Sequence, residues 1–402
     1  MSRAKSQRNF WLCLALEHLW GMYFGVGVAV VFYAYFGIDP TQIMVLQVIM
    51  GAATIIFDIP CGWLADRFGA RRVLLVGIGL QIIQSTLFGF FCTHFWQFAI
   101  MLAVTGVAWS FTSGTTKAIV IATVPARIND YPARSIQARS LGQLAGIVVG
   151  SILVVLYNAK IPFTVQPLPF IGAFVVAIRI VDSDAIKQRL THPQLRSIGE
   201  ISRKMFIDRP HVRWIVLLSA IANASVLAMV WLVQPALQAA GMSIALFGYL
   251  FAVRVVGTAV MAHFKDRFVK RFGDLGAQVA LITLIVACAV FAGSFVGWIG
   301  SIVVLICAAI VGAFAEALMI IAINKHMPEV KTHSTTVYSI SSATQSALFA
   351  VSPLMGLIND QVSTGAAYFF VASVTATFGG ISLYKYRRTL PHTPREQINL
   401  VA

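Results

Sequence analysis

The chain is poor in charge. Only 11% of its 402 residues are charged, whereas 58% are hydrophobic. A soluble domain carries about 25% charged and about 45–50% apolar residues. The scarcity of charge therefore excludes a soluble globular protein and predicts an integral membrane protein. Its length is sufficient for about twelve spans of roughly 20 residues with short loops between them.

Several chemical signatures are missing as well. The sequence contains no GxxxxGK[ST] phosphate loop and no apparent soluble domain, which argues against an ATP-driven pump. No catalytic triad or metal-ligand spacing is present, so we expect neither an enzyme nor a bound metal or other cofactor. The five cysteines lie in or beside apolar runs, where buried thiols behave as small hydrophobic groups.

The charge that is present is unevenly placed. The formal net charge is +15, and the Lys and Arg residues gather in alternate loops, while the other set of loops has almost nothing basic except Lys160. Such a bias places both termini in the cytoplasm. It predicts a multi-pass protein of a bacterial-type inner membrane, with anionic lipid headgroups rather than nucleic acid as the counter-charge.

Apolar runs predict the spans directly. They are all expected to be helices, because unpaired backbone groups cannot face lipid, and they cover 9–36, 42–65, 72–91, 96–124, 136–158, 164–181, 212–238, 244–264, 274–295, 298–326, 335–358 and 365–386. The first run is too long for a signal-peptide core and is interpreted as a retained span. The predicted units are an N-terminal bundle at 1–181, a basic cytoplasmic loop at 182–211, a C-terminal bundle at 212–386 and a cytoplasmic tail at 387–402. We expect a monomer.

The two predicted bundles share a repeated motif. The stretch ADRFGARR begins at Ala65 and KDRFVKRFG begins at Lys265, each after the second span of its half and 200 residues apart. Two similar halves of six helices, separated by a basic loop, are typical of a pseudo-symmetric transporter.

The first copy of the motif resembles the signature of the major facilitator superfamily. The matching residues are Gly62, Leu64, Ala65, Asp66, Arg67, Gly69, Arg71 and Arg72, with a departure at Ala70, where a basic residue is usual. The resemblance covers nearly the whole chain. It implies two six-helix bundles around a central cavity that opens alternately to the two sides of the membrane.

The resemblance also implies a cytoplasmic gate at the motif, in which Asp66 would clasp the end of a C-half helix in the outward-facing state. Gly69 permits a tight turn there. The residues expected at this gate are Asp58, Gly62, Asp66, Arg67, Gly69, Arg71 and Arg72, with Asp266 and Arg267 as the C-half counterparts. The second copy has Ala262 and Val269 where the first has glycine, so its gate is expected to be looser.

Five ionisable residues fall inside predicted spans, where charge is costly unless it is paired or hydrated. They are Glu17, Asp58, Lys117, Arg254 and Glu316. Their depths, at about 1.5 Å per residue, favour an N-half group of Glu17 or Asp58 with Lys117 and a C-half group of Arg254 with Glu316. Each group either serves transport or is an ion pair that holds helices together.

A buried carboxyl group beside a cation can move its pKa into the working range. Glu17 and Glu316 are therefore the candidates for proton coupling, and His18, which titrates near neutrality, is a candidate relay. The proton gradient is the expected energy source.

Two cations in the expected cavity, Lys117 and Arg254, favour an anionic or zwitterionic substrate. Further candidates for substrate contact share a place on the helices that the resemblance assigns to the cavity, and they are Tyr23, Trp109, Asn223, Trp231, Gln234, Tyr338 and Gln345. An aromatic-rich cavity with a few polar groups is typical of an organic-solute site. A stripe of Gly142, Gly146 and Gly150 is instead expected to let helices pack closely.

The leading function is thus secondary active transport of a small organic metabolite, coupled to protons. The first alternative is a multidrug proton antiporter, although Leu102 stands where such exporters of the family carry an arginine and the fifth span has no proline after its glycine stripe. The second alternative is a receptor or sensor built on the transporter fold, which the intramembrane charges disfavour. The sequence does not select the substrate, the direction or the stoichiometry.

Overall fold

The computed structural model describes residues 3–113, 115–124, 131–181, 199–200, 202–326 and 334–389. Within these ranges every regular element is a helix. Ten segments are long and apolar enough to cross a membrane, and Leu246–Met261 is a shorter apolar helix. The predicted all-α membrane architecture is therefore confirmed.

The helices follow the predicted spans to within a few residues, except where a span is built from two pieces. The N-terminal half contains α1 (Arg3–Gly21), η1 (Val26–Val28), α2 (Ala29–Tyr35), α3 (Pro40–Phe68), α4 (Ala70–Phe90), α5 (Phe95–Ser113), α6 (Thr115–Thr123), α7 (Tyr131–Leu156), α8 (Ile161–Thr164) and α9 (Pro167–Ile178). The C-terminal half contains the single π-turn η3 (Lys204–Asp208), then α12 (Pro210–Ala239), α13 (Ile244–Ala262), α14 (Lys265–Ser294), α15 (Trp298–His326), α16 (Ser334–Phe349), α17 (Ser352–Gln361) and α18 (Thr364–Thr389).

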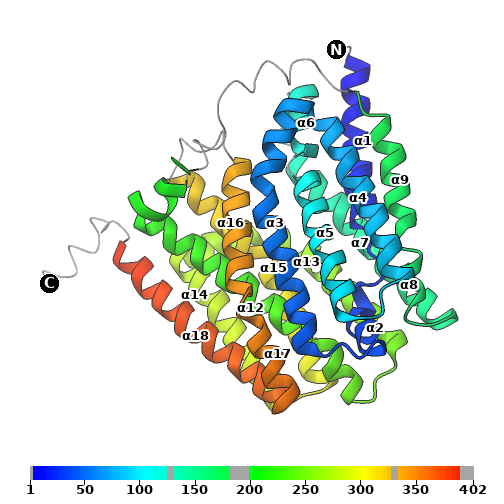
Figure 1. The fold of residues 1–402 in the computed structure, drawn as a ribbon. Helices are drawn as coiled ribbons and strands as arrows, with labels where there is room; N and C mark the ends of the chain where they lie inside the picture. The colour runs from blue at the N-terminus through cyan, green and yellow to red at the C-terminus, as the bar shows by residue number, and fades with distance from the viewer. Residues whose placement is uncertain are drawn as a thin grey trace, which may run out of the picture.

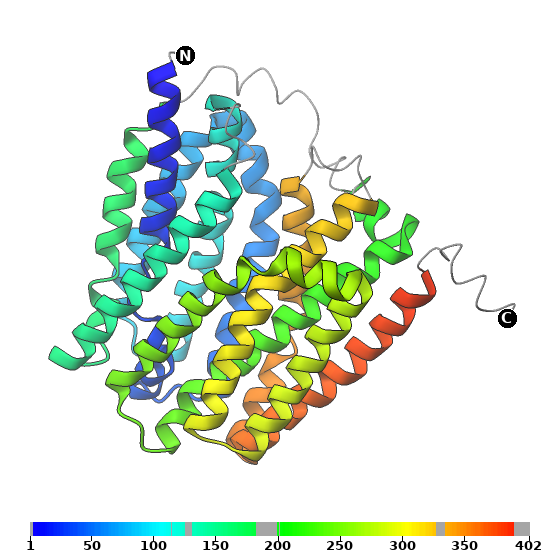
Figure 2. The ribbon, with the colours of Figure 1, turned by 180° about the vertical axis from the view of Figure 1, so that it is seen from behind.

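The two halves stand side by side (Figures 1 and 2). Their helices converge at the end that carries the turns before α3 and before α18, which we name the neutral end. They diverge toward the opposite end, which carries the N-terminus and the repeated motif and is named the basic end. The C-half core reaches across the neutral side and includes the N-half residues Val31, Met44 and Ile147.

The first span is not the continuous helix that we predicted. α1 ends at Gly21, and regular α-helix resumes at Ala29. Glycines at positions 21, 25 and 27 explain the break, because glycine disfavours the helix interior. The break also brings the chain close to its neighbours, since a side chain at Gly27 would meet the Gly248 backbone of α13 at 2.7 Å.

Two glutamine side chains satisfy the backbone groups that the break frees. The Gln166 amide accepts from Phe24 N–H at 2.8 Å and donates to the Met22 carbonyl at 3.0 Å. The Gln234 amide accepts from Val30 N–H at 2.9 Å and donates to the Val26 carbonyl at 3.0 Å. Gln166 precedes α9 in the N-terminal half, whereas Gln234 lies on α12 in the other half, so the break is stabilised by both.

A second clasp closes the neutral end. The backbone N–H and the hydroxyl of Thr41, at the start of α3, donate to Asp360 Oδ2 of α17 at 3.0 and 2.6 Å. The backbone at Thr41 also lies against Gly356, where an added Cβ would meet its Cα at 2.6 Å. Together with Gln234, this contact holds the halves together at the neutral end.

The turns of the repeated motif differ between the halves. Gly69 joins α3 to α4 with a φ of 95°, as the expected tight turn requires. The C-half copy has Val269 at the matching position, and its positive-φ residue is Gly273, with a φ of 68°. The stretch from Lys265 to Phe272 therefore forms a short helical segment before α14 continues as a span.

The glycine stripe of α7 packs as predicted. A methyl group at Gly142 would overlap the His18 carbonyl oxygen, and one at Gly150 would overlap the Phe24 carbonyl oxygen. One at Gly146 would meet the Tyr23 nitrogen at 2.8 Å. The stripe thus brings α7 against the end of α1 and the break.

Replacing Gly150 by Ala is expected to destabilise the protein by about 1–3 kcal/mol, because overpacking displaces the backbone at Phe24. The measurement is the melting temperature of the purified protein, in which size-exclusion chromatography detects the fraction that stays folded after heating. Gly79→Ala in α4 is the matched control, since nothing lies within 4 Å of the added Cβ. Equal melting temperatures for the two variants would contradict the packing role.

Candidate functional site

A cavity of about 600 Å³ lies between the two halves. It is lined by α1 to α8 of the N-terminal half, with the break in the first span, and by α12, α13, α15 and α16 of the other. Eight of the predicted residues line it, namely Glu17, Tyr23, Trp109, Asn223, Trp231, Gln234, Arg254 and Gln345. The side chains of Lys117, Glu316 and Tyr338 lie outside the described set.

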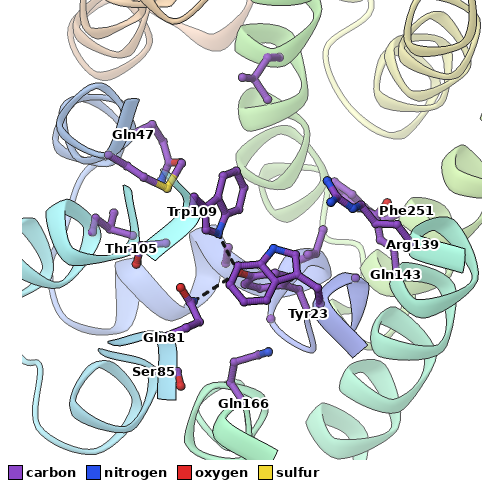
Figure 3. Close-up of a pocket in the computed structure, with 18 of the residues that line it drawn as sticks. Tyr23, Gln47, Gln81, Ser85, Thr105, Trp109, Arg139, Gln143, Gln166 and Phe251 are labelled. Carbon is purple, nitrogen blue, oxygen red and sulfur yellow. Dashed lines mark hydrogen bonds between the residues drawn. The ribbon is translucent and has the colours of Figure 1, made fainter. Parts of the chain in front are cut away.

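An aromatic and amide network forms the N-half wall of the cavity (Figure 3). The Tyr23 hydroxyl accepts from Trp109 Nε1 at 3.2 Å and from Gln81 Nε2 at 3.3 Å. Gln81 Oε1 is buried and has no hydrogen-bond partner among the described groups. A buried acceptor without a partner is costly, so this oxygen is ready to receive a donor from a solute in the cavity.

The Glu17 carboxylate is held by three side chains. Arg139 donates from Nη2 at 2.6 Å and from Nε at 3.1 Å to one carboxylate oxygen. The hydroxyls of Thr116 and Tyr131 donate to the other oxygen, each at 3.2 Å. The Glu17 side chain is 6% exposed and that of Arg139 is 55% exposed, so the acid is buried while the guanidinium faces the cavity.

This pairing adds to the sequence analysis, which expected Lys117 beside Glu17 or Asp58; the Lys117 side chain lies outside the described residues. The cation found on Glu17 is Arg139, a residue that the sequence analysis did not single out. The signal was available, because Arg139 lies inside the predicted span 136–158. α7 is turned so that this residue and Gln143 line the cavity.

Arg254 is the second described cation of the cavity. It lies on α13, and its buried Nε atom has no hydrogen-bond partner among the described groups. A buried guanidinium nitrogen without an acceptor is unfavourable, and a carboxylate or phosphate would satisfy it bidentately. Its expected partner, Glu316, lies on α15, but that side chain is not among those described.

Three predicted residues make contacts that differ from those expected. His18 does not line the cavity, and its Nδ1 atom lies 3.2 Å from the Ala138 carbonyl oxygen of α7. The oxygen and the nitrogen of the Gln234 amide are both hydrogen-bonded to the backbone of the first-span break, so its described role is structural. The Asn223 amide, which lines the cavity, donates to the Ser219 carbonyl at 2.9 Å within α12.

The expected gate residues lie at the basic end, apart from the cavity. Arg71 Nη2 donates to the Ile178 carbonyl at 2.5 Å and so ties the start of α4 to the end of α9. Arg67 lies 5.2 Å from the Trp63 ring centre. Arg72 and Arg267 are exposed, and Asp58 is half-buried on α3.

The surroundings of Gly62 and the side chains of Asp66 and Asp266 fall outside the described set, so the Asp66 latch remains a prediction. The neutral end is closed in this structure. The latch would act when the halves converge at the basic end instead.

A helical membrane protein whose paired halves enclose a mainly apolar cavity with a few charged and polar groups, closed at one end, has the architecture of a solute transporter. The sequence matches the family model of the Major Facilitator Superfamily over residues 10–353. The chain therefore belongs to the Major Facilitator Superfamily, and it is a transporter rather than an enzyme.

Solved structures share this fold at low sequence identity. A mutant form of the nucleoside transporter NupG has a TM-score of 0.77 at 12% identity and covers 96% of this chain and 100% of its own. A D-xylose-proton symporter has a TM-score of 0.74 at 15% identity, with 98% and 99% covered. A POT family transporter in complex with 5-aminolevulinic acid has 0.71 at 14%, with 96% of each chain covered.

Among curated sequences, an uncharacterized protein of Mycoplasma pneumoniae is 30% identical over a stretch that covers 21% of this chain and 67% of the relative.

The Gln234→Ala variant is expected to favour opening of the neutral end. It leaves Val30 N–H and the Val26 carbonyl unpaired in the closed state, at a cost of about 1–3 kcal/mol. Spin labels at Tyr35 and Val362, which are 77% and 72% exposed on opposite halves, report the opening by electron–electron double resonance. A longer-distance population should grow in Gln234→Ala.

Gln238→Ala, at an exposed position of the same helix, is the matched control and should leave the distances unchanged. Identical distributions for Gln234→Ala and the control would show that the amide does not close this end.

Proposed function

We propose that this protein is a proton-coupled secondary transporter that moves a small organic solute with an anionic group by alternating access. The observation that carries the proposal is the cavity itself, which holds a buried acid paired with an exposed guanidinium on one wall and, on the other, a guanidinium nitrogen with no partner among the described groups. Both walls belong to a single chain, so a monomer suffices for transport.

Glu17 and Arg139 supply the coupling. When Glu17 is ionised, its carboxylate holds Arg139. A proton on Glu17 removes the negative charge, weakens this pair and frees the exposed guanidinium for a substrate anion. Proton binding and substrate binding thus favour each other. Thr116 and Tyr131 keep the carboxyl group in place in either protonation state.

Arg254, Gln81 and the aromatic side chains define the substrate class. The two unpartnered groups, a donor on α13 and an acceptor on α4, suit a solute that carries both an acidic group and a hydrogen-bond donor. Trp109 and Tyr23 offer apolar surface between them. The transporters of similar fold carry polar organic solutes according to their names, a nucleoside and D-xylose, and one is in complex with 5-aminolevulinic acid.

The positive-inside rule supports placing the basic end in the cytoplasm. The structure then corresponds to an inward-facing state in a bacterial-type inner membrane. Because proton and solute binding favour each other in this scheme, it is a scheme for symport, in which an inward proton gradient accumulates the solute.

Glu17→Gln should uncouple transport from the proton gradient, because glutamine cannot exchange a proton. The probe solute is the one that raises the melting temperature most among 5-aminolevulinic acid, D-xylose and uridine. In proteoliposomes, the variant should lose gradient-driven net transport but retain exchange of labelled for unlabelled solute.

Asp208→Asn is the matched control, since Asp208 pairs with Arg203 at 3.7 Å on the exposed surface. Gradient-driven transport by Glu17→Gln at the normal rate would contradict the coupling role.

Arg254→Gln should remove the preference for an acidic solute. The test compares binding of 5-aminolevulinic acid with that of its methyl ester, which differs only in the carboxylate. Loss of a charged hydrogen bond costs about 1.5–3 kcal/mol, or about ten-fold or more in affinity for the acid, with little change for the ester. Arg254→Lys should recover part of the difference. An equal loss for acid and ester would show that Arg254 does not read the charge.

A further inference from the structure

A second hollow lies at the basic end of the C-terminal half, away from the central cavity. It has a volume of about 470 Å³ and lies between the end of α13, the two parts of α14 and α15. Its lining consists of Met261, Phe264, Arg267, Phe268, Arg271, Phe272, Ala280, Leu281, Leu284, Ile310 and Phe314. We name it the arginine groove. Its polar side chains are two arginines, and the rest of the lining is apolar.

Aromatic rings shape the groove. Phe268 stacks on Phe314 with ring centres 4.8 Å apart and planes at 7°, and its ring also lies 4.8 Å from that of Phe272. Phe314 is 5% exposed, whereas Phe264 and Phe272 are 43% and 48% exposed. The floor is therefore packed protein, and the rim offers apolar surface that is exposed in the described part of the chain.

The two arginines share one face of the segment from Lys265 to Phe272. Arg267 and Arg271 are four residues apart, a spacing that places both guanidinium groups on the same side of a helical turn. Both side chains are exposed, and no carboxylate among the described side chains pairs with either. Arg267 lies 6.0 Å from the Phe264 ring centre, and exposed Lys270 adds a third positive charge nearby.

The other copy of the repeated motif shows that this arrangement is not a general feature of the sequence pattern. Arg71 stands at the position that corresponds to Arg271, and it is bound to the Ile178 carbonyl of its own half. Phe68, which corresponds to Phe268, is 47% exposed. The C-half copy thus differs in that its phenylalanine packs into a groove and Arg271, unlike Arg71, has no bond to a described residue.

The position of the groove fits a lipid. The apolar part runs along α14 as far as Leu284, about 16 Å beyond Gly273 at 1.5 Å per residue, and so reaches into the depth of the membrane. The arginines lie at the membrane surface end, where basic amphipathic segments attract anionic headgroups. A guanidinium pair matches the oxygens of a phosphodiester.

We propose that the arginine groove binds one anionic phospholipid, with an acyl chain along the phenylalanine floor and the phosphate between Arg267 and Arg271. The site is separate from the transport cavity and does not depend on the proposed substrate or coupling. Bound lipid would hold the segment before Gly273 at the membrane surface, since no bond to a described residue holds Arg271 as the Ile178 carbonyl holds Arg71.

Native mass spectrometry tests the site. The intact protein is titrated with dioleoylphosphatidylglycerol and, separately, with dioleoylphosphatidylcholine. The wild-type protein should retain one phosphatidylglycerol preferentially. Arg267→Gln combined with Arg271→Gln should weaken this binding about ten-fold or more, since charged hydrogen bonds to the phosphate are lost. The lysine pair at the same positions should retain most of it.

Two further variants separate the alternatives. Arg387→Gln with Arg388→Gln removes an exposed basic pair at the end of α18 and should leave the tight site intact; an equal loss would show general electrostatic attraction and overturn the proposal. Ala280→Phe fills the groove without changing charge and should weaken phosphatidylglycerol binding as well. Unchanged binding in Ala280→Phe, or equal competition by inorganic phosphate, would overturn the acyl-chain part.

Discussion

The backbone of the first span sets the main constraint on this structure. A membrane helix that breaks must find new partners for its N–H and carbonyl groups, because lipid offers none. Here the partners are the amides of Gln166 and Gln234, one from each half. The break is therefore stabilised in part by contact between the two halves. It also directs Tyr23 into the cavity, where its hydroxyl receives Trp109 and Gln81.

The charged groups on the two walls of the cavity differ in how fully they are hydrogen-bonded. On the N-half wall every described oxygen of Glu17 has a donor, and the buried acid is balanced before any solute arrives. On the C-half wall one Arg254 nitrogen has no partner among the described side chains. In a low-dielectric site such an imbalance is strongly felt. A solute that accepts a hydrogen bond from this Arg254 nitrogen while it contacts the N-half wall would stabilise a state in which the halves lie closer together. Alternating access requires such a movement.

The sequence predicted the spans well because apolar runs report burial in lipid directly. It also located Gly69, since a tight turn between two long helices needs a residue that tolerates positive φ. It did not predict the break in the first span, because the hydrophobicity of the sequence stays high across it. The three glycines at positions 21, 25 and 27 were the available signal. It missed Arg139 as the partner of Glu17, because the pairing depends on the rotation of α7 against α1. The glycine stripe of α7 sets that rotation. Its spacing can be seen in the sequence, but the residues that it contacts on the first span cannot.

The repeated motif shows how two copies of one pattern come to serve different ends. In the N-terminal half the turn needs one glycine, and Arg71 caps the carbonyl end of α9, so the motif is tied to protein. In the C-terminal half the positive-φ residue moves to Gly273, the intervening residues remain helical, and Phe268 packs on Phe314. That displacement leaves Arg267 and Arg271 above an apolar hollow at the membrane surface. The two halves must move against each other during transport. If the N-half turn is bound to protein and the C-half turn to a lipid, the opening of the gate would depend on the composition of the membrane as well as on the solute.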